Sequence, residues 1–164
     1  MIVCIGEETY AEKPGDIRDL ALPPGQIEYV RAVRQKTNGK VILVFFGGRP
    51  RLLGDAVGLS DAVFVAFLPG PDGGQAVVDL IVGVTQEGEF VSPAGCLPVT
   101  YPRFGDGGGI PYWRAVSAKC TVGGGGGLPR FGYGECGVEW PFGFGLGYAA
   151  FVYGGGRSAW TKTF

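Results

Sequence analysis

The sequence of 164 residues contains no histidine. This absence excludes a Ser-His-Asp triad, a Cys-His pair and any zinc site with histidine ligands within the chain. Acid–base catalysis near neutral pH would therefore have to be carried by Asp, Glu, Lys, Tyr or Cys side chains.

The chain also lacks an excess of charge of either sign, with 14 basic and 15 acidic residues and a formal net charge of -1. No nucleic-acid partner is expected, because a phosphate-binding surface needs a clear basic excess. No apolar run approaches the ~20 residues that span a bilayer, so no membrane partner is expected. No G-x-G-x-x-G or Walker pattern follows an expected strand, which argues against a nucleotide cofactor.

The four cysteines form no C-x-x-C pair, which argues against a structural zinc site. We expect neither a metal nor a cofactor. Cys4 lies in an apolar run and is expected to be a buried thiol. Cys120 and Cys136 flank five consecutive glycines, residues 123–127. A disulfide between them would close that loop and would imply a secreted protein; two free thiols are the alternative.

The amino terminus places a strand directly before a cluster of carboxylates. Residues 2–5 (Ile-Val-Cys-Ile) have the pattern of a short buried strand. Residues 6–16, called the acidic loop below, contain Glu7, Glu8, Glu12 and Asp16. Repulsion between neighbouring carboxylates favours the protonated form of whichever is least solvated, as a general acid requires. A solvated loop with no role is the competing interpretation, which composition alone favours.

Apolar runs at residues 41–46 and 62–67 predict two further strands. Between the strands, residue spacing predicts a helix from about residue 25 to 38, a short helical or irregular piece over 52–59, and a helix after residue 74. This alternation predicts an α/β fold with a mostly parallel, doubly wound sheet, that is, an α/β sandwich.

The loops that follow parallel strands emerge at the same edge of the sheet, where such folds bind ligands. This geometry predicts that Glu12, Arg49 and Asp72, one from each loop, lie within reach of one another. Arg49 follows two glycines and is able either to clamp a carboxylate or to hydrogen-bond to loop carbonyl groups.

The second half of the chain has a different composition. Most of the 32 glycines and 12 prolines follow residue 70, and aromatic residues are spread among them. This combination predicts a backbone that is irregular but ordered and packed over a core. The five glycines at 123–127 are expected to form a mobile loop tip.

Five motifs occur in an order that resembles a known family. They are GE…YAEKPGD (6–16), GRP (48–50), LPG…GG (68–74), LPVTYP (97–102) and WPFGFGLGY (140–148). The series resembles the carboxyl-terminal α/β sandwich domain of glycoside hydrolase family 3, the β-glucosidase and exo-β-glucan hydrolase group. The resemblance covers residues 1–151 as a partial domain, and it leaves 152–164 as a tail or linker.

The resemblance implies a retaining glycosidase that hydrolyses a β-linked glucoside or oligosaccharide. It matches Glu12 to the general acid/base, with Glu7 as the second candidate because the loop varies in length across the family. Residues expected to line the substrate loop or to support the catalytic groups are Tyr10, Asp16, Arg49 and Asp72.

In many family members the nucleophile is an Asp on a preceding (β/α)8 barrel. We therefore expect this chain to be a fragment that lacks its barrel and is inactive alone. The resemblance also implies a secreted full-length protein, although this chain shows no signal peptide. The alternative is a non-catalytic α/β module that binds a carbohydrate or another partner.

Overall fold

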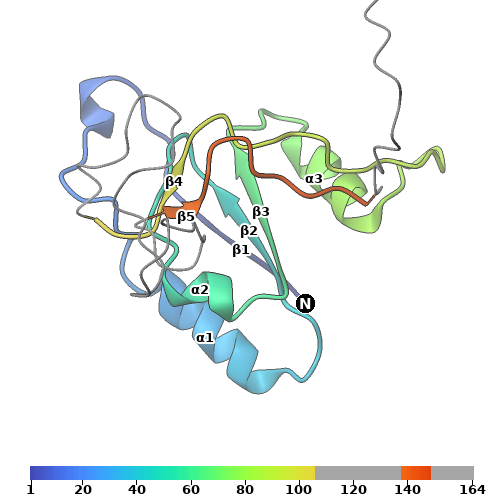
Figure 1. Ribbon diagram of the computed structural model, residues 1–164, viewed down its shortest axis with the longest axis horizontal. Helices are drawn as coiled ribbons and strands as arrows, with labels where there is room; N and C mark the ends of the chain where they lie inside the picture. Colours follow the sequence, from blue (N-terminus) through green and yellow to red (C-terminus); the bar gives the residue numbers. More distant parts are fainter. Residues whose placement is uncertain (106–137, 149–164) are drawn as a thin grey trace, which may run out of the picture.

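The computed structural model describes residues 1–105 and 138–148 of the chain (Figure 1). The elements in this part are β1 (Ile2–Gly6), the short 3-10 helix η1 (Lys13–Gly15), α1 (Gln26–Lys36), β2 (Ile42–Phe46), α2 (Asp55–Gly58), β3 (Ala62–Phe67), α3 (Gly73–Val82), β4 (Tyr101–Pro102) and β5 (Val138–Trp140). None of the helices described here is long and apolar enough to cross a lipid bilayer.

Strands β1, β2 and β3 form a parallel sheet in that order. Ile2 pairs with Ile42 and Gly6 with Phe46, so β1 and β2 end side by side. Helices α1 and α2 lie on the same side of the sheet, whereas α3 lies apart from them (Figure 1). The predicted α/β fold with a parallel sheet is confirmed, and the carboxyl ends of its strands share one edge.

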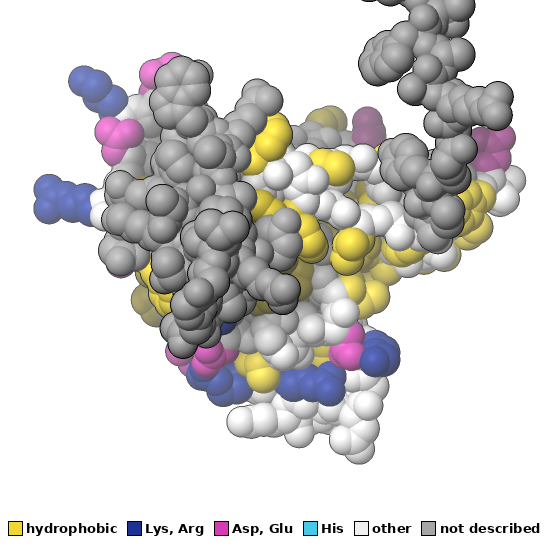
Figure 2. Space-filling view, in the orientation of Figure 1, with side chains coloured by type: hydrophobic (Ala, Val, Ile, Leu, Met, Phe, Trp, Pro, Cys, Tyr) yellow, Lys and Arg dark blue, Asp and Glu magenta, His cyan; other side chains and the backbone are white. Residues whose placement is uncertain are grey.

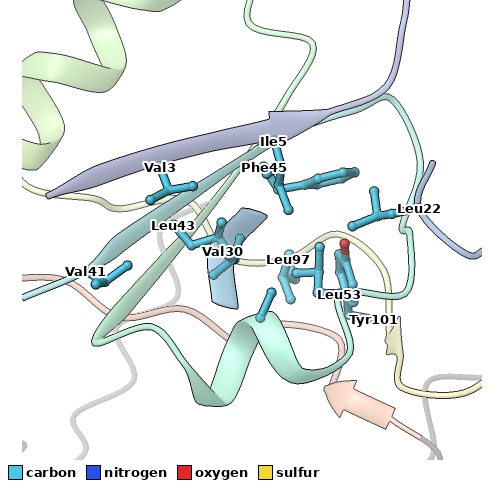
Figure 3. Packing of buried hydrophobic residues seen from close by; sticks show 11 residues of the cluster. Val3, Ile5, Leu22, Val30, Val41, Leu43, Phe45, Leu53, Leu97 and Tyr101 are labelled. Atoms are coloured by element: carbon cyan, nitrogen blue, oxygen red, sulfur yellow. The ribbon is translucent and has the colours of Figure 1, made fainter. Parts of the chain in front are cut away.

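The hydrophobic core lies between the sheet and the helices α1 and α2 (Figure 3). Because side chains alternate along a strand, Val3 and Ile5 of β1 and Leu43 and Phe45 of β2 all face this side. Val30 of α1 is fully buried against them. Burial of each such side chain stabilises the fold by about 1.5–3 kcal/mol, so this layer fixes the position of the strand ends.

The expectation that Cys4 is buried is wrong, because the residue is exposed. It alternates with Val3 and Ile5 and therefore points to the face of the sheet opposite α1 and α2. Ile2, which shares that face, is 51% exposed. Four consecutive apolar residues predict a strand, but they do not reveal which of its two faces is covered.

Irregular segments from the second half of the chain pack over the core, as their aromatic content predicts. Tyr101 in β4 is fully buried, and its ring meets that of Trp140 in β5 edge-on with 5.1 Å between centroids. Leu97 and Phe144 are joined by a backbone hydrogen bond of 2.8 Å. The glycines at 123–127, the cysteine pair and the proposed tail lie outside the described residues.

Burial raises the pKa of Tyr101 to about 12, from an ordinary value of 10.0. The folded protein therefore keeps this proton at a pH at which the unfolded chain has lost it, so ionisation favours unfolding. We expect the free energy of unfolding to fall between pH 10 and 12, and the fall to be smaller in Tyr101→Phe. Denaturant titrations of both proteins across this pH range measure the difference. Equal slopes would contradict the assigned burial.

Candidate active site

The loops that follow the three parallel strands meet at one edge of the sheet. The Glu7 N–H donates to the Phe46 carbonyl at 2.9 Å, which fixes the start of the acidic loop beside the end of β2. Gly48 lies between the other two loops: a Cβ at this position would stand 2.7 Å from the Tyr10 hydroxyl and 2.9 Å from Leu68. A side chain at this position would require Tyr10 or Leu68 to shift, because all three loops approach closely.

Glu7 is enclosed at this edge and is paired with two arginines. Its side chain is only 6% exposed, and its Oε1 accepts hydrogen bonds from Arg49 Nε at 3.1 Å and Arg51 Nη1 at 2.7 Å. The buried Oε2 and Arg51 Nε have no hydrogen-bond partner in the described part of the chain. Arg51 also donates to the Ala21 carbonyl, and its backbone N–H donates to the Tyr101 hydroxyl. Glu7 therefore joins several segments through its ion pairs.

Arg49 both pairs with a carboxylate and hydrogen-bonds to a loop carbonyl group, the two roles that the sequence left open. Besides pairing with Glu7, it donates through Nη1 to the Gly15 carbonyl at 2.6 Å. Its guanidinium lies over the ring of Tyr10, with 4.1 Å from Cζ to the ring centroid. A Cβ on Gly15 would come within 2.6 Å of that same ring. We call Glu7, Tyr10, Gly15 and Arg49 the arginine clamp.

Glu12 differs from Glu7 in its surroundings. It is exposed, and its side chain forms no hydrogen bond or ion pair with any residue of the described ranges 1–105 and 138–148. Its backbone has φ 55° and ψ -150°, a conformation that side-chain-bearing residues rarely adopt. Its carbonyl accepts the Gly15 N–H at 2.9 Å, which closes the η1 turn.

The remaining residues predicted for the site are placed less closely. Asp16 follows η1, and its carboxylate is exposed. Asp72 precedes α3 and is also exposed. Within the part of the chain that the structure describes, neither carboxylate forms a hydrogen bond or ion pair with Arg49 or Glu12. The structure thus brings Arg49 to the acidic loop, where its guanidinium lies over the Tyr10 ring, but among the described residues it gives Asp72 no bond there.

Two residues of the site were missed by reasoning from the sequence. Gln26, the first residue of α1, accepts a hydrogen bond from the Gly6 N–H and donates one to the Gly6 carbonyl, at 2.9 and 2.7 Å. It thereby fixes the strand end from which the acidic loop departs. Arg51 is the second, and the sequence offers one signal for it, a second arginine two residues after Arg49 and close to the end of a buried strand.

An open depression of about 500 Å³ lies beside the strand end, lined by residues 4–8, 24–26, 29 and 46. Glu12 is not part of its wall. Among the described residues, no group of three or more Cys, Asp or Glu side chains is placed to hold a metal ion.

The model of the glycosyl hydrolase family 3 C-terminal domain matches residues 1–148. The chain belongs to this family.

Curated relatives agree with this assignment to the family 3 C-terminal domain. The lysosomal β-glucosidase of Dictyostelium discoideum is 34% identical over 154 residues, which are 93% of this chain and 16% of that protein. A β-xylosidase of Formosa agariphila is 34% identical over 140 residues, or 85% of this chain and 18% of that protein. The chain thus spans less than one fifth of the length of these relatives.

A solved structure shows the same fold. The β-glucosidase of Listeria innocua in complex with isofagomine matches with a TM-score of 0.70 and 22% identity. The match covers 90% of this chain and 20% of the bacterial enzyme. The α/β sandwich is therefore the observed fold of this family 3 C-terminal domain.

Removal of the Glu7 charge should destabilise the domain strongly. Glu7→Gln leaves two guanidinium groups, one of them largely buried, without a counter-charge, and the free energy of unfolding should fall by about 3–5 kcal/mol. The exposed neighbour supplies a matched control, because Glu8→Gln removes the same charge one residue away. Urea titrations of the two variants measure the contrast. Equal, small losses in both would show that the Glu7 ion pairs add little.

The backbone conformation of Glu12 leads to a second prediction. Glycine adopts positive φ without strain, so Glu12→Gly should exceed Glu12→Ala in free energy of unfolding by about 1 kcal/mol. Elsewhere glycine is the less stable of the two residues. Thermal and urea denaturation of the pair provide the comparison, and an alanine variant at least as stable as the glycine variant would exclude strain at this position.

Proposed function

We propose that this chain is the acid/base-bearing domain of a retaining, β-glucosidase-like glycoside hydrolase. Glu12 is the general acid/base in this proposal, and a carboxylate on a (β/α)8 barrel domain is the nucleophile. The single observation that carries the assignment to Glu12 is the contrast between the two candidate carboxylates. Glu12 is exposed and has no side-chain partner among the described residues, whereas the Glu7 side chain is 6% exposed and bonded to two arginines.

Each catalytic step places a demand on Glu12. In the first step it donates a proton to the glycosidic oxygen while the nucleophile attacks the anomeric carbon and the C–O bond breaks. In the second step its carboxylate takes a proton from the water that hydrolyses the glycosyl–enzyme bond. Glu12 must therefore exchange protons with substrate and water, and an exposed carboxylate at the edge of the domain meets this requirement.

Glu7 does not meet this requirement for proton exchange with substrate and water. Its Oε1 already accepts hydrogen bonds from two arginines, and its side chain is only 6% exposed. A substrate oxygen would have to displace Arg49 or Arg51 to reach it. Glu7 therefore serves as an anchor for the acidic loop in this proposal, and Glu12 takes the catalytic role.

One carboxylate is not sufficient for this chemistry. Retaining hydrolysis requires two carboxyl groups about 5–5.5 Å apart, on opposite sides of the scissile bond. The nucleophile belongs to the barrel domain in this proposal, so the chain by itself should be inactive. The substrate is a β-linked glucoside or oligosaccharide, and the names of the relatives make a β-xyloside the first competitor to compare. We also propose a secreted or lumenal location, in keeping with a relative named as lysosomal.

The experiment uses a fusion enzyme in which this chain replaces the matched 154-residue region of the Dictyostelium β-glucosidase. The fusion should hydrolyse aryl β-glucosides, while the chain alone should not. Glu12→Gln in the fusion should lower kcat/KM for a phenyl glucoside by about 10²–10⁴-fold, because the phenolate leaving group needs a proton from the general acid. Azide should restore turnover of a dinitrophenyl glucoside, whose leaving group needs no proton, because azide attacks the glycosyl–enzyme in place of the water that Glu12 would activate. Circular dichroism checks that each protein is folded.

Three results would overturn this proposal. Turnover by the chain alone that disappears in Glu12→Gln would place both catalytic groups within it. A fully active Glu12→Gln fusion would move the acid/base elsewhere. A folded fusion that binds a glucoside without turnover would favour the alternative, a non-catalytic module that binds carbohydrate.

A further inference from the structure

We propose that Arg49 is a positioning residue. It holds the carboxylate of Glu12 in its catalytic position through the hydrogen bond that Arg49 donates to the Gly15 carbonyl. This inference rests on the proposed function, since it takes Glu12 as the acid/base. The arginine clamp connects the rigid end of the sheet to the only turn of the acidic loop, and Glu12 stands at the start of that turn.

At the end of the sheet, the clamp is anchored by Glu7. Arg49 Nε donates to Glu7 Oε1 at 3.1 Å, and Arg51 Nη1 occupies the same oxygen at 2.7 Å. Glu7 follows β1 directly and is itself held by the backbone bond to Phe46 at the end of β2. Because the Glu7 side chain is only 6% exposed and bonds to both arginines, the guanidinium of Arg49 has a fixed partner at the end of the sheet.

On the other side, the same guanidinium holds the loop. Its Nη1 donates to the Gly15 carbonyl at 2.6 Å, and its Cζ lies over the ring of Tyr10, 4.1 Å from the centroid. Gly15 in turn donates its N–H to the Glu12 carbonyl at 2.9 Å. Three consecutive hydrogen bonds therefore run from Glu7 through Arg49 and Gly15 to Glu12.

The backbone of Glu12 shows why such a restraint is needed. A non-glycine residue at φ 55° and ψ -150° is strained, and such a conformation persists only where its surroundings impose it. The exposed side chain of Glu12 contributes no bond of its own within the described residues. The restraint must therefore come through the backbone of the η1 turn, and Arg49 is the side chain that bonds to that turn.

Lysine should not replace this arginine. The planar fork of a guanidinium donates to Glu7 and to Gly15 in two fixed directions at once, while an ammonium is a point charge on a flexible chain. Arg49→Lys keeps the charge beside Glu7 but loses the geometry that holds Gly15. A comparison of Arg49→Met with Arg49→Lys therefore separates charge from position.

The first measurement is hydrogen–deuterium exchange of the Gly15 and Asp16 amides, both of which donate within the η1 turn. In the chain with Arg49→Met, these amides should exchange about tenfold faster than in the unmodified chain. The control is Arg31→Met, which removes an arginine from the exposed ion pair with Asp55 between α1 and α2. It should leave both amides unchanged. Unchanged exchange in Arg49→Met would overturn the inference.

The second measurement tests whether loss of the restraint by Arg49 impairs proton transfer from Glu12 to the leaving group. In the fusion enzyme, kcat/KM is measured for two aryl glucosides whose leaving groups differ in basicity. A dinitrophenolate departs without a proton, whereas a phenolate needs one from the general acid. Arg49→Met should lower kcat/KM for the phenyl glucoside by about 10–100-fold, and for the dinitrophenyl glucoside by less than about threefold. Arg49→Lys should resemble Arg49→Met.

A double variant tests whether the two residues act through the same step. If Arg49 works by positioning Glu12, then Arg49→Met should cause no further loss for the phenyl glucoside once Glu12→Gln is present. A merely structural role would lower the rates for both leaving groups alike and would add to the Glu12→Gln loss.

The outcomes distinguish this inference from the proposed function. If Glu12→Gln shows the leaving-group dependence and Arg49→Met does not, Arg49 has no positioning role and Glu12 keeps its own. If Glu12→Gln shows no such dependence, or if the folded fusion has no activity, the proposed function fails and the inference falls with it.

Discussion

The buried carboxylate of Glu7 is the constraint on which this edge of the domain depends. A charge that is almost fully removed from water requires opposite charge beside it, since desolvation alone would strongly favour unfolding. The two arginines that supply it lie 42 and 44 residues further along the chain. They reach Glu7 only because β1 and β2 are adjacent, parallel and end in register. The ion pairs therefore depend on the sheet topology.

This arrangement separates two carboxylates that lie five residues apart in the sequence. The Glu7 carboxylate is paired and enclosed, whereas that of Glu12 is exposed, has no partner in the part of the chain that the structure describes, and lies on a turn of unusual backbone conformation. Division of labour between nearby carboxylates by their surroundings is a recurring feature of glycosidases. Here the division has a direct physical link, because Arg49, which neutralises Glu7, also holds the turn that begins at Glu12. In the proposed arrangement, the charge that pairs with Glu7 and the restraint on the Glu12 carboxylate come from the same guanidinium.

The open edge of the sheet also fits a domain that works with others. The chain corresponds to 16–20% of the length of family relatives and of a solved enzyme with this fold. The depression beside Glu7 does not include Glu12, so the described residues do not enclose a sugar around the proposed acid/base. A site that lies between domains gains its second wall, and in this proposal its nucleophile, from the neighbouring domain.

The sequence by itself determined the order of strands and helices, the parallel sheet and the shared edge of the three loops. These features follow from local patterns: apolar runs, helical spacing and glycine or proline stops act over a few residues. The tertiary structure alone decided that Glu7 is buried and Glu12 exposed, that Cys4 faces outward, and that Arg51 shares the anchor while Asp72 does not. Burial and pairing depend on residues that are distant in the sequence. Four carboxylates spread over one loop therefore do not reveal which of them will be covered by those distant residues.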